Sequence, residues 1–186
     1  MLKIGILSTA HMHADSYAAE VNGHPGAKLV GLWDPDATRL AAKTAQYGTA
    51  AFNGTDELLA VSDAVIVCSE NIHHRALTES AAKAGKAILC EKPLATTPDD
   101  ARAMINACVA ANVPLFTAFP CRFSPAFQTL KEAVHRGDLG DILAVRGTNR
   151  GKCPGGWFVD LALSGGGAVM DHTVHVTDLL RVLLHS

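Results

Sequence analysis

The chain contains 186 residues, of which 48% are hydrophobic and 18% are charged, and its formal net charge is −2. This is the composition of a folded globular protein, and the length allows one large domain or one domain and part of a second. Basic residues are neither in excess nor clustered, which excludes a nucleic-acid-binding surface. No apolar run approaches the roughly 20 residues of a membrane helix, and the pattern of a signal peptide is missing, so we expect no membrane segment.

The first 120 residues alternate between apolar strands and helices. The patterns predict strands at 3–7, 27–34, 49–52, 63–69, 87–90 and 113–119, and helices at 14–24, 35–48, 56–60, 73–86 and 97–112. Pro35 suits the start of the second helix and Gly48 its end. This alternation predicts an α/β fold with a doubly wound parallel sheet.

The pattern changes near residue 120. A helix and turn over 124–140 precede a single expected strand at 141–149 and a loop rich in glycine and proline at 150–158. A final helix is expected from Ser164 onward. We interpret residues 121–186 as the beginning of a second α/β domain, and the abrupt stop of its last helical pattern leads us to expect that this domain is incomplete.

The cysteines, five in all, are odd in number, widely spaced and without a C-x-x-C pair. This usage predicts reduced thiols, most of them buried as small hydrophobic residues. Reduced thiols in turn indicate a cytoplasmic protein.

The loop after the first strand reads STAHMH, where a nucleotide-binding loop normally carries G-x-G-x-x-G. The three glycine places hold Ser8, Ala10 and His13, with His11 and Met12 between them. Because serine and alanine tolerate positive φ poorly, we expect this loop to keep an ordinary L-residue conformation. A histidine near the positive end of the following helix should prefer its neutral form.

Asp34 ends the second strand, about two dozen residues after this loop. A carboxylate there can bind both ribose hydroxyls of an adenosine and repel a 2′-phosphate, but it can equally cap the helix that starts at Pro35. The nearby Arg39 could instead accept a 2′-phosphate. Beyond the strand at 63–69, polar residues follow where α/β sheets bind ligands, although histidines at a helix start can also be surface residues. They are Ser69, Glu70, Asn71, His73 and His74.

Two further motifs carry chemistry. In Glu91-Lys92-Pro93 the proline pushes Lys92 toward extended backbone, which projects its ammonium group into the crevice at the sheet edge. In DHTVH, Asp171 and His175 are four residues apart and would share one helix face as a general base and its partner. A solvated polar stripe is the alternative, but the three glycines just upstream favour close approach by a ligand or by backbone.

Together these motifs resemble the glucose–fructose oxidoreductase / inositol dehydrogenase / rhizopine-catabolism family of NAD(P)-dependent oxidoreductases. The segments that carry the resemblance are KIGILSTAH, SENIHH, GKAILCEKPLA, AFPCRFSPAF and SGGGAVMDHTVHVTDLL. The resemblance implies a Rossmann domain over 1–120, followed over 121–186 by the start of a domain that supplies much of the substrate pocket and the oligomer interface. It implies a homo-oligomer for the full-length protein.

The resemblance also implies a reaction and its residues. The cofactor would be NAD, with NADP as the alternative, and the substrate a secondary alcohol of a sugar, cyclitol or related polyol. His175, assisted by Asp171, would take the hydroxyl proton, and Lys92 would hold the oxygen. The residues implied near the substrate are Arg122, His172 and Asp178; those implied around the cofactor are Ser8, Ala10, His11, Met12, Asp34, Ser69, Asn71, His74 and Glu91.

Two other functions remain as alternatives. His11 and His13 form an H-x-H pattern that barrel hydrolases use to hold zinc, but such a barrel needs about 250 residues. We therefore expect these histidines to line the cofactor and predict no metal. The second alternative is a catalytically silent ligand-sensing or partner-binding module of the same fold, which the incomplete second domain suggests.

Overall fold

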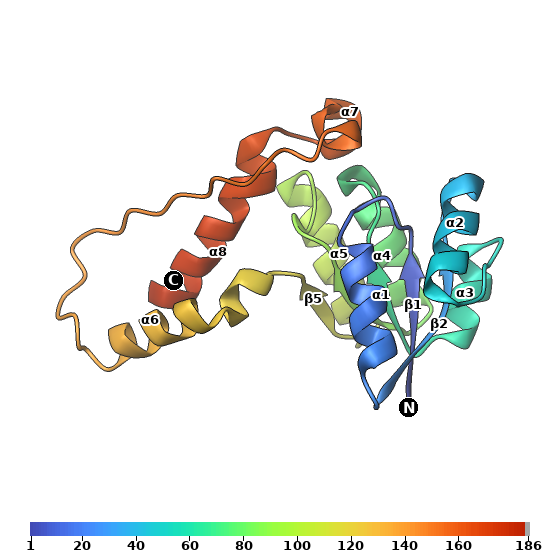
Figure 1. Cartoon of the computed structure of the whole chain (residues 1–186), viewed down its shortest axis with the longest axis horizontal. Coiled ribbons are helices and arrows are strands. Elements are labelled where there is room, and N and C mark those ends of the chain that lie inside the picture. The colour runs from blue at the N-terminus through green and yellow to red at the C-terminus, as the bar shows by residue number, and fades with distance from the viewer. Residues whose placement is uncertain (185–186) are drawn as a thin grey trace.

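The computed structural model describes residues 1–184, and its centre is one parallel sheet (Figure 1). The strands are β1 (Leu2–Leu7), β2 (Ala27–Trp33), β3 (Ala64–Val67), β4 (Ala87–Cys90) and β5 (Leu115–Thr117), in the order β2-β1-β3-β4-β5. The strand expected at 49–52 is reduced to one bridge between Ala51 and Leu32. With that bridge counted at the β2 edge, the order becomes 3-2-1-4-5-6, which is the Rossmann order. The doubly wound α/β prediction is confirmed, and the open sheet contradicts the barrel of the hydrolase alternative.

Five helices cover the two faces of this sheet. They are α1 (Ala14–Gly23), α2 (Ala37–Tyr47), α3 (Thr55–Val61), α4 (His74–Lys83) and α5 (Pro98–Ala110). Because successive strand residues point to opposite faces, Ile6 packs with α1 and α2 while Leu7 packs with α3, α4 and α5. The result is two apolar layers, one on each side of the sheet.

The start of α2 differs from the expectation. The helix begins at Ala37 rather than Pro35, and its N-cap is Asp36, whose carboxylate accepts a hydrogen bond from the backbone N–H of Arg39. Asp34 is therefore not the cap of this helix. The predicted end is confirmed, because Gly48 adopts the left-handed conformation with φ of 65°.

Residues 120–184 form helices without a sheet of their own. They comprise α6 (Pro125–His135), α7 (Leu161–Ser164) and α8 (Val174–Leu184), with a π-helical turn at Val169–Thr173 and short 3-10 turns at Pro120–Phe123 and Gly156–Val159. The strand expected at 141–149 is wrong: this stretch has no regular structure. A strand needs a neighbour for its backbone hydrogen bonds, and no described residue pairs with it.

The final helix also begins later than Ser164. Gly165 ends α7 in the left-handed conformation with φ of 71°, and the helical pattern resumes only at Val169. A Cβ at Gly165 would lie 2.3 Å from Thr96 Cγ2, so the glycine allows close contact with the first domain. The side chain of Asn71 adds a hydrogen bond of 2.8 Å to the backbone oxygen of Ser164. These contacts hold the second part of the chain at the carboxyl edge of the sheet.

The cysteine prediction holds for the chain as a whole. All five are free, Cys68, Cys90 and Cys108 are buried, and Cys121 and Cys153 are more accessible. Among the described residues, no helix combines the length and hydropathy required to cross a membrane.

The two-layer core leads to a stability prediction. Leu58 is fully buried beneath β1 and Leu143 is 94% exposed. We expect Leu58→Ala to lower the free energy of unfolding by roughly 2–5 kcal/mol, because it leaves a cavity. Leu143→Ala should change it by less than about 0.5 kcal/mol. Urea denaturation of both variants tests this, and equal losses would contradict the assignment of the core.

Candidate functional site

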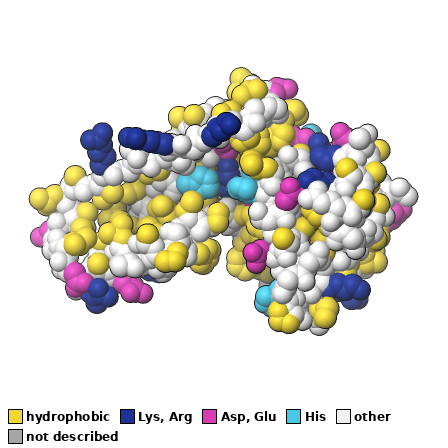
Figure 2. Space-filling view, in the orientation of Figure 1, with side chains coloured by type: hydrophobic (Ala, Val, Ile, Leu, Met, Phe, Trp, Pro, Cys, Tyr) yellow, Lys and Arg dark blue, Asp and Glu magenta, His cyan; other side chains and the backbone are white. Residues whose placement is uncertain are grey.

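The candidate site lies where the loops after β1, β3 and β4 meet the second part of the chain. A cavity of about 240 Å³, here called the site cavity, opens between the loops after β1 and β4 and the second part of the chain. Figure 2 shows histidine side chains at the junction of the two parts. The lining of the site cavity includes seven residues that the sequence analysis named as candidates: His11, Met12, His13, Lys92, Asp171, His172 and His175.

The loop after β1 departs from the expected backbone at one position. Ser8 has a φ of 64°, so the prediction of an ordinary conformation is wrong there, whereas Ala10 has no positive φ. Hydrogen bonds compensate for this strained conformation. Ser8 Oγ lies 3.3 Å from Asp34 Oδ2 and accepts a hydrogen bond of 3.3 Å from the N–H of Ala10. Ser8 therefore takes the conformation of the first glycine because its side chain bonds within the loop.

Asp34 is buried and turned toward this loop. Its Oδ2 accepts from the N–H of Thr9 at 2.7 Å, and both carboxylate oxygens bind the guanidinium of Arg39 at 2.7 and 2.8 Å. Burial opposes ionisation, but these hydrogen bonds outweigh it and hold the pKa of Asp34 below its usual range. Arg39 also lies 3.6 Å from Glu70. The adenosine end of the expected cofactor site thus presents a guanidinium beside the carboxylate.

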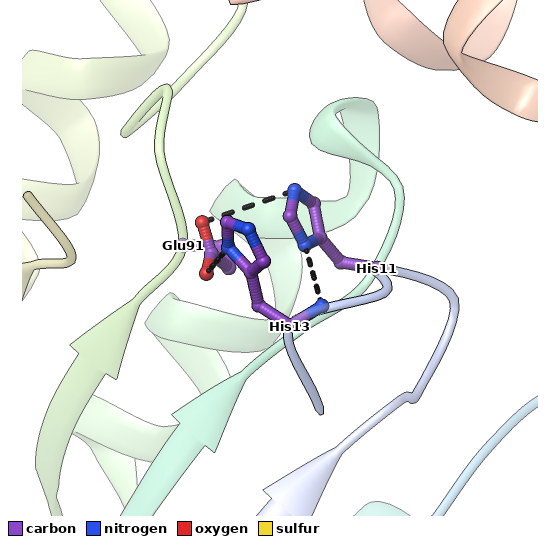
Figure 3. Close-up of side chains that lie close together, drawn as sticks. All are labelled: His11, His13 and Glu91. Carbon is purple, nitrogen blue, oxygen red and sulfur yellow. Dashed lines mark hydrogen bonds and ion pairs between the residues drawn. The ribbon is translucent and has the colours of Figure 1, made fainter. Parts of the chain in front are cut away.

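A second buried carboxylate, Glu91, lies at the opposite side of the loop (Figure 3). Its Oε1 is 2.8 Å from His13 Nδ1 and accepts a hydrogen bond of 2.6 Å from the hydroxyl of Tyr17. Its Oε2 accepts from the N–H of Lys92 at 2.9 Å and is 3.9 Å from His11 Nε2. Burial raises the pKa of Glu91, but the hydrogen bond from His13 and the nearby His11 outweigh it and lower the pKa to about 2.

His11 is 1% exposed and neutral at ordinary pH. Burial is the main cause and lowers its pKa to about 4, although Glu91 acts in the opposite direction. The expectation of a neutral histidine is therefore correct, but the cause is burial more than the helix end. The backbone N–H of His13 donates to His11 Nδ1 at 3.2 Å, whereas the buried Nε2 has no hydrogen-bond partner.

Lys92 and Asp171 form an ion pair across the two parts of the chain. The Nζ of Lys92 lies 2.5 Å from Asp171 Oδ1, and the lysine side chain is 5% exposed. The same carboxylate lies 3.2 Å from His172 Nδ1. The direct assistance that the sequence led us to expect between Asp171 and His175 is not found, because Asp171 lies in the π-helical turn and binds the buried ammonium group. The i, i+4 argument assumed regular α-helix.

His175 has other neighbours. Its Nδ1 lies 3.8 Å from the Sγ of Cys121, and its ring meets Phe119 edge-on. Burial and the ammonium group of Lys92 lower its pKa, while Asp171 acts in the opposite direction. His175 is therefore a neutral imidazole at pH 7, with Cys121 as a neighbour that the sequence analysis missed.

The remaining predicted residues fall into three cases. Arg122 and Asp178 form a bidentate ion pair and line a separate cavity next to α8, away from Lys92. Asn71 and His74 use their side chains within the protein: the ring nitrogens of His74 lie 2.9 Å from the backbone oxygen of Pro93 and 3.3 Å from that of Ser69. Met12 is exposed. The cofactor and substrate roles of all these residues stay predictions.

An aromatic pair covers the loop after β1, and the sequence analysis missed it. Trp157 Nε1 donates a hydrogen bond of 3.0 Å to the backbone oxygen of Ala10, and its ring stacks on Phe158 at 3.8 Å. Phe158 meets His11 edge-on at 5.3 Å. The sequence did contain a signal for this contact, because two adjacent aromatic residues follow two glycines in the loop at 150–158.

Comparison with known proteins agrees with this architecture. Residues 2–119 match a family described as an oxidoreductase family with an NAD-binding Rossmann fold, and residues 127–186 match the GFO/IDH/MocA C-terminal domain. A 1,5-anhydro-D-fructose reductase from Ensifer adhaerens is 36% identical over 166 residues, which cover 86% of this chain and 50% of the relative. Inositol 2-dehydrogenase of Rhizobium meliloti is 31% identical over 184 residues, which cover 98% of this chain and 55% of the relative. The chain thus spans about half the length of these curated relatives.

Two solved structures show the same arrangement. The aldose-aldose oxidoreductase from Caulobacter crescentus, complexed with glycerol, has a TM-score of 0.84 and 27% identity, and the alignment covers 99% of this chain and 58% of that one. The WlbA dehydrogenase from Bordetella pertussis, in complex with NADH and UDP-GlcNAcA, has a TM-score of 0.83 and 26% identity, with 98% and 55% covered. Both parts of the chain therefore have counterparts in these two solved structures.

The buried His11 leads to a prediction on pH. Its pKa is about 4 when folded and about 6.5 when unfolded, so the unfolded state binds the proton more readily between these values. Stability should therefore fall with falling pH across this window, with roughly 2–3 kcal/mol due to His11 between pH 7.5 and pH 4.5. His74 and His175, whose pKa values are also lowered, act in the same direction.

Urea denaturation at the two pH values measures this loss. His11→Gln should lose less stability than the wild type over the same interval, whereas the exposed His24→Gln should behave like the wild type. An undiminished loss in His11→Gln would show that His11 is not buried in its neutral form.

Proposed function

Because the chain belongs to the GFO/IDH/MocA family of oxidoreductases, we propose that its protein is an NAD-dependent dehydrogenase acting on a secondary alcohol of a sugar, cyclitol or related polyol. The observation that carries this proposal is the joint placement of Lys92, Asp171 and His175 around one cavity, next to the loop after β1. The similar reductase and inositol 2-dehydrogenase are named for substrates of this kind.

The site fits a dinucleotide on two structural grounds. The loop after β1 lies at the carboxyl edge of the parallel sheet, where Rossmann folds bind such cofactors. His11 lines the site cavity, and its buried Nε2 faces Glu91 at 3.9 Å without making a hydrogen bond, so the polar capacity of this loop is not fully used within the protein. The loop would hold the dinucleotide at its phosphates, and a bound nicotinamide would supply the hydride acceptor.

The residues of this chain then handle the alcohol and its proton. Lys92 is a buried ammonium group held by Asp171, so it can bind the substrate oxygen at a fixed point. His175 is neutral at pH 7, because burial and Lys92 lower its pKa, and can therefore accept the hydroxyl proton. Asp171 acts as a positioning residue for Lys92, since its carboxylate binds the ammonium group directly.

Arg39 supports the use of NADP as well as NAD. The acceptor atoms of Asp34 are already bonded to Thr9, Asp36 and Arg39, so this carboxylate has little capacity left for the ribose hydroxyls. The guanidinium of Arg39 offsets its charge and is 26% exposed. A 2′-phosphate would thus meet a cation at the position where an unpaired aspartate would repel it.

The roles of Lys92 and His175 can be separated from cofactor binding. In the complete enzyme, Lys92→Ala and His175→Ala should retain NADH binding and lower turnover by roughly 10²- to 10⁴-fold, because each removes a group that handles the hydroxyl. Fluorescence titration with NADH and a turnover assay measure the two effects. Full activity in either variant would contradict the assigned role.

Cofactor choice tests the role of Arg39. We expect Arg39→Ala to weaken NADP binding by roughly tenfold, since it removes a charged hydrogen-bond donor, and to leave NAD binding equal or stronger. The matched control is Arg102→Ala, because Arg102 is 70% exposed and pairs with Asp99 on α5. Calorimetric titration with each cofactor measures the ratio of affinities. An unchanged ratio in Arg39→Ala would show that Arg39 does not face the 2′ position.

A further inference from the structure

The proton positions around Glu91 determine what its two histidine neighbours can do. Glu91 is ionised and accepts hydrogen bonds through both oxygens, so the proton in its 2.8 Å contact with His13 belongs to His13 Nδ1. His11 Nδ1 accepts the backbone N–H of His13, so the proton of neutral His11 is on Nε2, which faces Glu91 Oε2 at 3.9 Å. Both rings thus direct an N–H toward the same carboxylate.

This arrangement disfavours a metal ion between the three residues. His11, His13 and Glu91 can offer ligand atoms within 4.8 Å of one another, and two histidines with one glutamate form a known catalytic zinc set. However, the two nitrogens that face Glu91 carry protons, and Tyr17 and the N–H of Lys92 already occupy its oxygens. A metal-bound histidine normally donates its second nitrogen's proton to an acceptor, whereas His11 Nδ1 faces a donor.

The same arrangement leaves one ring nitrogen of His13 available to a ligand. In its neutral form His13 carries the lone pair on Nε2, because Nδ1 holds the proton. Nε2 makes no hydrogen bond with any residue that the structure describes, the side chain is 37% exposed, and His13 lines the site cavity together with Lys92 and His175. The ring is held from behind by Glu91 and packs against His11 at 4.4 Å, so its direction is fixed.

We propose that His13 is a ligand-binding residue whose Nε2 accepts a hydrogen bond from a hydroxyl group of the molecule bound in the site cavity, with Glu91 as its positioning residue. The proposal rests on the proposed function, which places a hydroxyl-bearing cofactor or substrate there. The hydroxyl can come from a ribose of the cofactor or from the polyol. In either case the ligand donates to the neutral form of the ring, in which Nδ1 carries the proton that faces Glu91 and Nε2 is left as the acceptor.

Nitrogen-15 spectra of protein labelled at histidine test the proposal without requiring turnover. In the free protein we expect His13 to show a protonated Nδ1 and an unprotonated Nε2, and His11 the reverse. Addition of NADH, and then of myo-inositol to the NADH complex, should shift the His13 Nε2 resonance. A shift with NADH alone identifies a hydroxyl of the cofactor as the donor, and a shift only after myo-inositol identifies the polyol.

Two substitutions of the same residue separate its two nitrogens. The amide nitrogen of His13→Asn can replace Nδ1 as donor to Glu91 but leaves the Nε2 position empty, so this variant should fold and bind the identified ligand about 3- to 10-fold more weakly. The longer side chain of His13→Gln can return an acceptor to the Nε2 position and should recover part of the affinity. The control His24→Gln, at an exposed position outside the site, should bind like the wild type.

The positioning role of Glu91 has its own readout. Glu91→Gln removes the carboxylate that fixes the proton on His13 Nδ1, so the His13 spectrum should change to a mixture of tautomers. An unchanged tautomer in Glu91→Gln would overturn the positioning role.

Other outcomes would overturn the ligand-binding role of His13. If NADH binds and neither addition shifts His13 Nε2, this role is wrong while the proposed function stands. If NADH does not bind, the proposed function fails and this proposal fails with it. If Zn²⁺ alone shifts both His11 and His13 at a stoichiometry of one, the three residues are a metal centre instead.

Discussion

The buried carboxylate of Glu91 is the constraint on which the site depends. A carboxylate without solvent exposure at the end of a central strand is costly unless donors surround it. The chain supplies those donors from three elements: Tyr17 from α1, His13 from the loop after β1, and the N–H of Lys92 from its own strand end. The direction of Lys92 and the position of the loop after β1 are therefore set by one group.

Asp34 provides a similar constraint at the other side of the same loop. It directly follows β2, is buried, and accepts hydrogen bonds from the N–H and hydroxyl of Thr9. The loop after β1 is thus held between two carboxylates at the ends of β2 and β4. In a glycine-rich loop the backbone itself can adopt positive φ, but here Ser8 adopts it while its hydroxyl donates a hydrogen bond to the side chain of Asp34. Hydrogen bonds to Asp34 and Glu91 thus hold the loop after β1 in place, although it lacks the glycines of the usual nucleotide-binding loop.

Secondary structure that depends on neighbouring residues could be predicted from the sequence. Contacts between residues far apart in the sequence could not. The alternation of strands and helices and the helix end at Gly48 follow from local rules, and both are found. The expected strand at 141–149 has the right local composition, but strands also need a partner, which composition does not reveal. The strand expected at 49–52 is reduced to a single bridge at Ala51 for the same reason, because composition does not reveal how many residues find a partner.

The candidate site shows the same division. The sequence placed Lys92, Asp171 and His175 together, and the structure brings all three to one cavity. It could not show that Asp171 binds Lys92, because that choice depends on a π-helical turn and on the burial of the lysine. The positive φ of Ser8 also depends on Asp34, which lies 26 residues along the chain.

In the proposed function, the pairing of Lys92 with Asp171 would limit how the proton of the alcohol is handled. A buried ammonium group needs a counter-charge, and breaking such a pair leaves an uncompensated charge in the interior. Asp171 therefore remains paired with Lys92 and does not also serve as the counter-charge for a protonated His175. The structure compensates by keeping His175 neutral, through burial and the nearby ammonium group, so that it begins as an acceptor. If His175 accepts the proton as proposed, the ammonium group of Lys92 repels the new positive charge, which would favour prompt release of the proton.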